Sequence, residues 1–250
     1  MQKYFEINEE GHNIRCKLYA ENPKNIRKAV LFAHGFGGHK DNGAAQRFAE
    51  YVMAKYRGIA VITFNFPCHG DDVKKKFSLA DCIRYLELCA EYIRKEFTEE
   101  INIYATSFGG YVVLNELALH GNSFRKIVLR CPALNMYESF MGRILKEEDL
   151  EKLRKGKEAP AGFDRKVMVG NSFIEELREN DLFELEFLDY ADDILILHGT
   201  EDEVVPFEVS KRFCEDNVIE FVPVPGADHR FRNPKHMDLA IKAIVEFFGF

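Results

Sequence analysis

A serine, an aspartate and a histidine each follow a short apolar run, in the order Ser107, Asp202 and His229. A serine hydroxyl is a weak nucleophile at neutral pH. It therefore needs an imidazole as its base and a carboxylate that orients the imidazole. This chain order, with each residue in a loop after a predicted strand, can bring the three partners together at one edge of a sheet. We interpret them as a catalytic triad for acyl transfer.

The stretch "INIYATSFGGYVV" places Ser107 between a strand-like run and an apolar helix. A nucleophile held on such a tight turn needs small residues two positions before and two positions after it. Ala105 and Gly109 meet this demand, although glycine is more usual at the first of the two positions. The alternative is that Ser107 only caps the helix that follows it.

The segment "HGFGGHKDN" follows another apolar run, and its glycines allow the backbone to approach a ligand closely. We expect the backbone N–H groups of Phe36 and Phe108 to form an oxyanion hole. We also expect His34 and Gly35 to contact the substrate. Phosphate binding is the competing interpretation, but the segment contains neither G-x-x-x-x-G-K-[ST] nor G-x-G-x-x-G.

The sequence offers more than one candidate for the acid and for the base. Asp202 is preferred to Glu201 and Glu203 because the short turn "GTED" can direct its carboxylate back toward the sheet edge. His229 lies in the loop after the last predicted strand. The other histidines are expected either on the surface (His12, His39, His120, His236) or bracing turns before glycines (His34, His69, His198).

The composition is that of an ordinary water-soluble protein, with 46% hydrophobic and 30% charged residues and a net charge of −7. Such a chain lacks the basic surface that binds nucleic acid or anionic membranes. Its six cysteines show no C-x-x-C spacing, which argues against a zinc site or a disulfide framework. The charged first residues do not resemble a secretion signal, so we expect a cytoplasmic protein without membrane insertion.

Short β-rich runs alternate with stretches of helical period, which is typical of α/β proteins with a parallel sheet. We predict one domain over residues 1–250 with a mostly parallel eight-stranded sheet flanked by helices. The predicted strands lie near 3–11, 12–19, 28–34, 59–66, 101–105, 126–131, 193–198 and 218–224. Helices are expected over 79–97 with a cap at Ser78 and Asp81, after Ser107 up to Gly121, and after Asn233-Pro234.

The longest interval between predicted strands contains residues 133–190, and we expect there a small helical cap over the sheet edge where such folds bind ligands. Its apolar residues can line an acyl or aryl pocket or simply pack. They are Met136, Phe140, Met141, Ile144, Leu145, Phe163, Met168 and Phe173. Arg143, Arg154 and Arg165 can bind an acidic leaving group, or they can form a solvated face.

The segments "HGFGGHKDN", "FNFPCHGDD", "ATSFGG", "HGTEDEVVP" and "GADHRF" together resemble the α/β-hydrolase superfamily over nearly the whole chain. The chain looks most like the small-capped carboxylesterases, which include bacterial cinnamoyl and feruloyl esterases and monoglyceride-lipase-like enzymes. It departs from their usual pattern at Ala105, and at Asn65, Pro67 and Cys68 in "FNFPCHGDD".

This resemblance implies that Ser107 is the nucleophile, that His229 is the general base and acid, and that Asp202 orients His229. The expected substrate is a small carboxylic ester, either short-chain or hydroxycinnamoyl, and no cofactor or metal is needed. A serine peptidase, a thioesterase or acyltransferase, and a catalytically silent binding protein on the same scaffold remain alternatives. The oligomeric state is left open.

Overall fold

The computed structural model describes residues 1–250, and its centre is one eight-stranded sheet with the order β1-β2-β4-β3-β5-β6-β9-β10. The strands are β1 (Gln2–Glu9), β2 (His12–Ala20), β3 (Lys28–Ala33), β4 (Ile59–Phe64), β5 (Ile101–Thr106), β6 (Ile127–Arg130), β9 (Ile194–Gly199) and β10 (Glu220–Val224). All eight predicted strands are present. The pairings are parallel except those of β1 with β2 and of β2 with β4, as the mostly parallel prediction required.

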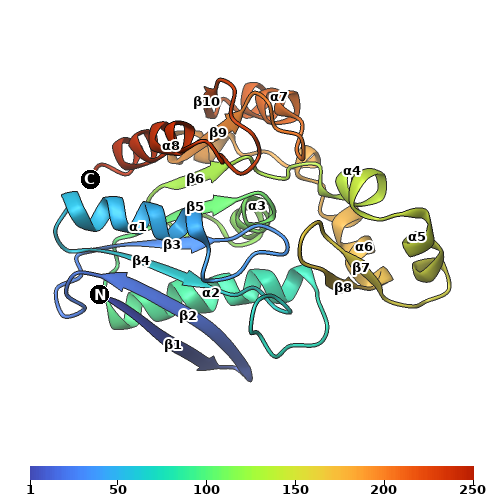
Figure 1. Cartoon of the computed structure of the whole chain (residues 1–250), viewed down its shortest axis with the longest axis horizontal. Coiled ribbons are helices and arrows are strands. Elements are labelled where there is room, and N and C mark those ends of the chain that lie inside the picture. Colours follow the sequence, from blue (N-terminus) through green and yellow to red (C-terminus); the bar gives the residue numbers. More distant parts are fainter.

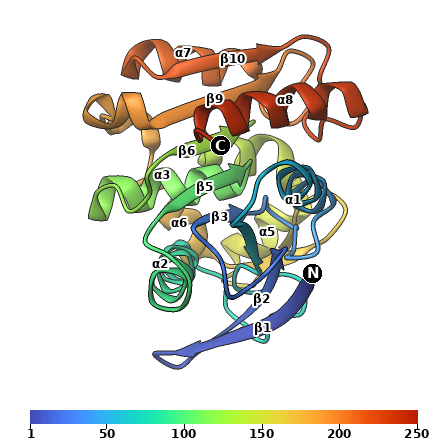
Figure 2. The ribbon, with the colours of Figure 1, turned by 90° about the vertical axis from the view of Figure 1, so that its left-hand side faces the viewer.

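Helices cover both faces of the sheet (Figures 1 and 2). On one face lie α1 (Gly43–Lys55) and α8 (Pro234–Phe247), and on the other lie α2 (Leu79–Glu96), α3 (Phe108–His120) and α7 (Phe207–Asn217). Each face has its own apolar core, because strands covered on both sides must be apolar on both sides. This is the α/β-hydrolase fold.

The helix boundaries follow the capping signals in the sequence. The hydroxyl of Ser78 accepts a hydrogen bond from the N–H of Asp81 at the start of α2. Asn233 caps α8 just before Pro234, and α3 ends at Gly121, whose φ of 82° places it in the left-handed region. These three predictions are confirmed.

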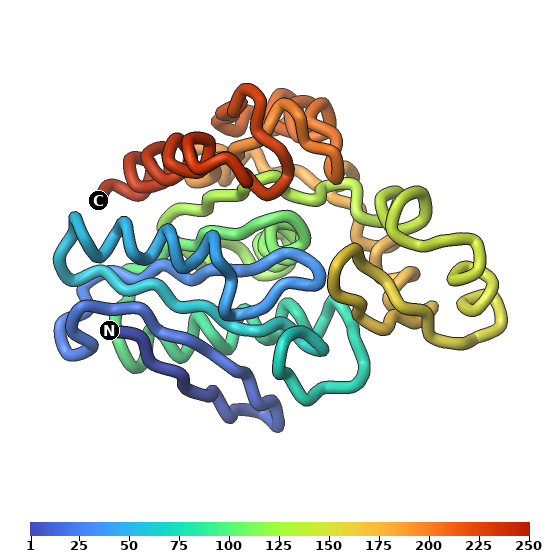
Figure 3. The backbone as a smooth tube through the Cα atoms, in the orientation of Figure 1, coloured from blue at the N-terminus to red at the C-terminus, as the bar shows by residue number.

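The segment between β6 and β9, which we call the insertion, lies beyond one end of the central sheet (Figures 1 and 3). It contains α4 (Met136–Ser139), η1 (Phe140–Ile144), α5 (Glu147–Arg154), β7 (Ala159–Ala161), β8 (Val167–Val169), α6 (Asn171–Glu179), η2 (Leu182–Glu184) and η3 (Leu188–Asp193). The helices expected in this segment are present, and the segment also contains an antiparallel hairpin of β7 and β8 that the sequence did not predict. Runs of three residues carry too little periodicity to be predicted as strands.

All six cysteines are free thiols, and every one except Cys68 is buried. None of the helices combines the length and the apolar character that crossing a membrane requires.

Candidate active site

Ser107 occupies the turn between β5 and α3 with φ 52° and ψ −119°, a backbone conformation that serine rarely adopts. Its N–H donates to the carbonyl of Arg130 and its carbonyl accepts from the N–H of Ala133, both at 3.1 Å. Its side chain makes no capping hydrogen bond to α3. The structure therefore does not support the alternative in which Ser107 is only a helix cap.

Close packing around the turn explains the small residues that flank Ser107. A Cβ at Gly109 would lie 2.5 Å from the carbonyl oxygen of Ala33 and 2.7 Å from that of His34, so no larger residue fits without moving the backbone. Ala105 lies within β5, between Ala33 and Leu129 of the neighbouring strands. Its methyl group is accommodated in an ordinary strand position, and glycine is not required there.

The backbone N–H groups of Phe36 and Phe108 are available as donors. Phe108 is the first residue of α3, where an N–H has no intrahelical partner, and the N–H of Phe36 donates to no backbone carbonyl. Gly35, the residue before Phe36, packs against the turn that contains Ser107. A Cβ at position 35 would lie 3.1 Å from the Cβ of Ser107. This arrangement fits an oxyanion hole.

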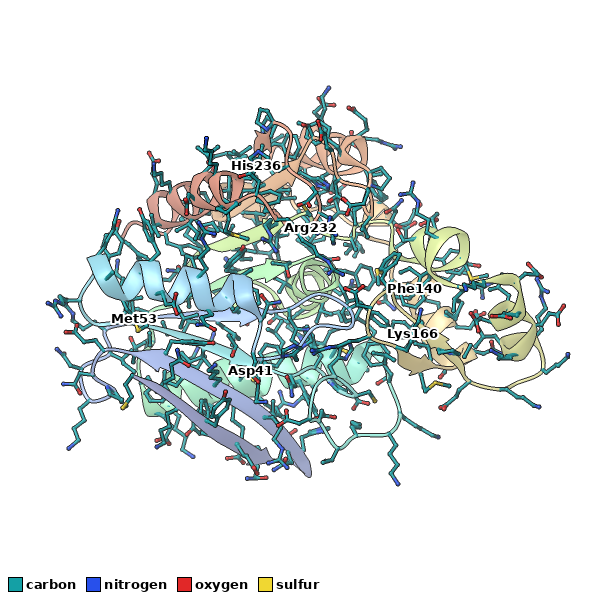
Figure 4. All side chains as sticks on the ribbon, in the orientation of Figure 1. Asp41, Met53, Phe140, Lys166, Arg232 and His236 are labelled. Carbon is teal, nitrogen blue, oxygen red and sulfur yellow. The ribbon has the colours of Figure 1, made fainter.

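The side chains of the two donor residues belong to one aromatic cluster. The ring centroid of Phe36 lies 5.6 Å from that of Phe108 and 5.1 Å from that of Phe140, a residue of the insertion labelled in Figure 4. Phe173 of α6 joins the cluster through contacts with Phe140 and with Phe77, at 5.4 and 4.6 Å. The cluster fixes the loop and the helix that carry the two N–H groups.

Asp202 and His229 are hydrogen-bonded, with Nδ1 of the histidine 2.7 Å from Oδ2 of the carboxylate. The side chain of Asp202 is fully buried, and its Oδ1 accepts the N–H groups of Val204 and Val205 at 2.8 Å each. The neighbouring Glu203 instead accepts the backbone N–H of His229. The geometry therefore singles out Asp202 among the three consecutive acids.

A second histidine also contacts Asp202, and the sequence interpretation missed it. His198 is fully buried at the end of β9, and its Nε2 lies 3.1 Å from Oδ2 of Asp202 and 3.2 Å from the carbonyl of Val205. Its Nδ1 lies 2.8 Å from the hydroxyl of Ser210. Because both acceptors face Nε2, that nitrogen carries the proton and Nδ1 accepts from Ser210.

The environment of Asp202 keeps it ionised. Burial alone would raise the pKa of this carboxyl, but the hydrogen bonds from His198 and His229 outweigh it, and the pKa lies well below its ordinary value. The Cys131 sulfur approaches the same group, and Cys131, His198 and Asp202 have potential ligand atoms within 4.8 Å of one another. Burial raises the pKa of the Cys131 thiol well above its ordinary value.

Ser107 and His229 line one cavity of about 670 Å³, although their side chains form no direct hydrogen bond. Such catalytic hydrogen bonds are often longer before a substrate is bound. The loop that contains Phe36 and the segment between β6 and β9 complete the wall. Its lining includes Gly35, Phe36, Asn42, Thr106, Arg130, Met136, Ser139, Arg143, Ile144, Phe163, Arg165, Val204, Arg230 and Arg232.

Several residues expected at the substrate lie elsewhere. His34 is fully buried and does not line the cavity, because its Nε2 accepts the N–H of Phe66 beneath the loop. Of the expected insertion residues, Met136, Ile144 and Phe163 line the cavity, whereas Phe140, Leu145 and Phe173 are buried in packing. Arg143 and Arg165 line it, but Arg154 pairs with Glu147 on α5 and does not.

The sequence of the chain matches one known protein family. The model of the prolyl oligopeptidase family matches residues 43–249. The chain belongs to the prolyl oligopeptidase family. No curated protein matches its sequence.

Solved structures that share the fold of this prolyl oligopeptidase family member include a ferulic-acid complex, a lipase and a hydrolase-domain protein. Est1E from Butyrivibrio proteoclasticus, solved with ferulic acid bound, is 23% identical with a TM-score of 0.77, covering 97% of each chain. A monoglyceride lipase variant from Saccharomyces cerevisiae is 15% identical with a TM-score of 0.74, covering 98% of this chain and 94% of its own. Mouse alpha/beta hydrolase domain-containing protein 10 is 15% identical with a TM-score of 0.73, covering 99% and 98%.

Proposed function

We propose that this protein is a serine hydrolase that cleaves carboxylic esters through an acyl-enzyme intermediate. One observation carries the proposal: Ser107, in a strained backbone conformation and without a capping role, lines the same cavity as a histidine that is hydrogen-bonded to a buried aspartate. Strain of this kind persists where the surrounding structure enforces it, and it is concentrated at functional sites.

The proposed reaction begins with attack of the Ser107 hydroxyl on the ester carbonyl. Nδ1 of His229 is bound to Asp202, which leaves Nε2 to take the serine proton and pass it to the departing alcohol. The N–H groups of Phe36 and Phe108 stabilise the oxyanion, and each such donor contributes typically about 3 to 4 kcal/mol. Water then hydrolyses the acyl-enzyme by the same proton transfers.

We further propose that residues 133–190 act as a cap that shapes the substrate pocket. Met136, Ile144 and Phe163 of this segment supply apolar side chains to the cavity that contains Ser107. That wall suits a short acyl or hydroxycinnamoyl group, and the fold shared with the ferulic-acid complex of Est1E is consistent with such an ester.

Peptide hydrolysis is the second candidate, because the family that includes this chain is named for a peptidase. The same triad can cleave an ester or an amide. Comparing aryl esters with aminoacyl anilides of matched acyl groups separates the two activities, and a preference for the anilides would replace the esterase assignment.

The direct test is a panel of short-chain, long-chain and hydroxycinnamoyl esters assayed with the wild type and with Ser107→Ala. We expect cleavage of short aryl esters and a loss of at least about 10³-fold in the variant, as for other triad nucleophiles. Ser172→Ala, which changes an exposed serine on α6, is the matched control. Equal turnover by Ser107→Ala, or failure of a fluorophosphonate probe to label the wild type at Ser107, would refute the assignment.

A further inference from the structure

Arg130 is a buried cation without a partner of opposite charge. It is the last residue of β6 and only 6% exposed, yet it forms no ion pair, and its Nε has no hydrogen-bond partner. One terminal nitrogen approaches the sulfur of Met237 at 3.6 Å, and the guanidinium lies 5.1 Å from the ring centre of Phe231. Neither contact offers an oxygen acceptor.

Such an arrangement is costly for an arginine. A guanidinium cannot lose its proton in a protein, so burial does not neutralise it as it neutralises lysine or histidine. Buried charges are therefore normally paired with an opposite charge. An unpaired buried arginine among the residues that line a cavity points to an anion that binds from outside the chain.

Arg130 stands beside the proposed nucleophile. Its Cα pairs with that of Thr106, the residue before Ser107, and its carbonyl accepts the Ser107 N–H. Adjacent strands are only about 4.8 Å apart, and paired residues point to the same face. Thr106 and Arg130 both line the cavity that contains Ser107.

The start of α1 does not compete with Arg130 for an anion. Asn42, Gly43 and Ala44 line the same cavity, but the side chain of Asn42 already accepts the N–H groups of Ala44 and Ala45. We call the part of the wall formed by Thr106 and Arg130 the Arg130 subsite.

The acidic residues of the cavity do not satisfy Arg130. Asp41, Asp164 and Glu203 are the three, and each already pairs with another cation: Asp41 with Lys17 and Lys40, Asp164 with Arg230, and Glu203 with Arg232. Asp41 and Arg232, both labelled in Figure 4, are among the residues that line this cavity. The protein as a whole carries a net charge of −7, so the unpaired cation is a local feature.

We propose that the substrate is a carboxylate-bearing ester whose anionic group binds Arg130 in this subsite, within a few bonds of the scissile carbonyl. The inference rests on the proposed ester hydrolysis and narrows it to an anionic substrate class. It also explains why the chain keeps a destabilising buried charge next to its nucleophile, since active sites commonly sacrifice stability for binding.

The test uses paired esters that differ in charge but little in size. For a carboxylate on the acyl part, the pair is the p-nitrophenyl monoester of glutaric acid and p-nitrophenyl hexanoate. For a carboxylate on the alcohol part, the pair is 4-acetoxybenzoate and its methyl ester. We expect the wild type to prefer the anionic member of at least one pair by about tenfold or more in kcat/KM, a preference that weakens with added salt.

The variant Arg130→Met keeps an unbranched, flexible side chain of somewhat shorter length and removes the charge. We expect it to lose the preference, lowering the anionic-to-neutral ratio by about tenfold or more, while its Tm stays equal or rises because an unpaired buried charge is gone. Arg154→Gln is the matched control, because this arginine is exposed, pairs with Glu147 and lies outside the cavity. It should leave the ratio unchanged.

Different failures are distinguishable. Wild-type cleavage of neutral esters as well as or better than both anionic partners would overturn the inference and leave the esterase function intact. An equal fall for charged and neutral esters in Arg130→Met, with a lower Tm, would show that Arg130 is structural. If no ester is cleaved, the proposed function fails, and the subsite is judged by whether glutarate or benzoate raises the Tm of the wild type but not of Arg130→Met.

Discussion

At the scale of single residues, the proposed site combines groups that form no hydrogen bond within the fold with one carboxylate whose oxygens are all hydrogen-bonded. The Ser107 side chain does not cap α3, and the N–H groups of Phe36 and Phe108 are not used by the fold. Asp202, in contrast, has every oxygen engaged, because two backbone N–H groups and two imidazoles surround it. The proposed nucleophile is thus available for reaction, while the carboxylate proposed to orient His229 is held fixed.

The second imidazole on Asp202 leads to a prediction at this scale. His198→Leu removes the Nε2–H donor, which raises the pKa of Asp202 and loosens the carboxylate that holds His229. Loss of a hydrogen bond to a charged group costs about 1.5 to 3 kcal/mol, so we expect kcat/KM for an aryl ester to fall about 10-fold to 100-fold.

The matched control for this prediction is His198→Gln, which keeps an amide N–H at the same site. Its kcat/KM should fall less than that of His198→Leu, whereas equal losses in the two variants would show that His198 acts through packing alone.

At the scale of elements, the insertion packs against the rest of the molecule through aromatic side chains. Phe140 from η1 contacts Phe36, and Phe173 from α6 contacts Phe77, which precedes α2. Phe140 and Phe173 also contact each other. Offset and edge-to-face ring pairs of this kind add stability beyond the burial of their area. The insertion therefore shares one aromatic cluster with Phe36 and Phe108, whose N–H groups we propose as the oxyanion hole.

Removing one ring from this cluster tests the coupling between the insertion and the site. Phe173 is fully buried, and Phe173→Ala should lower the free energy of unfolding by about 3 to 5 kcal/mol, as large-to-small core substitutions do. Urea denaturation measures this change, with Leu188→Ala, at a residue that is 51% exposed, as the control. A change below about 1 kcal/mol would mean that the insertion is not packed against the body as described.

At the scale of the whole molecule, buried histidines link stability to pH. Burial lowers the pKa of His69 from 6.5 to about 4, and burial together with the charge of His69 lowers the pKa of His34 well below its ordinary value. Between these values the unfolded chain binds protons that the folded protein excludes. Acidification therefore favours unfolding, and the stability present above 6.5 is lost as the pH falls toward about 4.

From this difference we predict that His69 alone removes about 3 kcal/mol of the free energy of unfolding between about pH 7 and about pH 4. Denaturant unfolding at several pH values measures the slope. Glu116, whose pKa is raised by burial, acts in the opposite sense, so the comparison is between the wild type and His69→Gln. An equally steep slope in the variant would contradict the assignment to His69.

The sequence alone determined the strands of the central sheet, their mostly parallel arrangement, the helix caps and the candidates Ser107, Asp202 and His229. These follow from local signals: apolar periodicity, turn residues, and polar side chains placed just after strands. The sequence also predicted that the residues at positions 105 and 109 must be small, and the close contacts around Gly109 agree with this.

Only the tertiary structure decided which residues share the cavity and which atoms lack partners. The unpaired charge of Arg130, the hydrogen bond from His198 to Asp202, the burial of His34 and the pairing of β7 with β8 all depend on how separate segments pack. A sequence pattern reports how a residue relates to its neighbours along the chain. Burial and hydrogen bonding depend on neighbours in space, and most of these come from other segments of the chain.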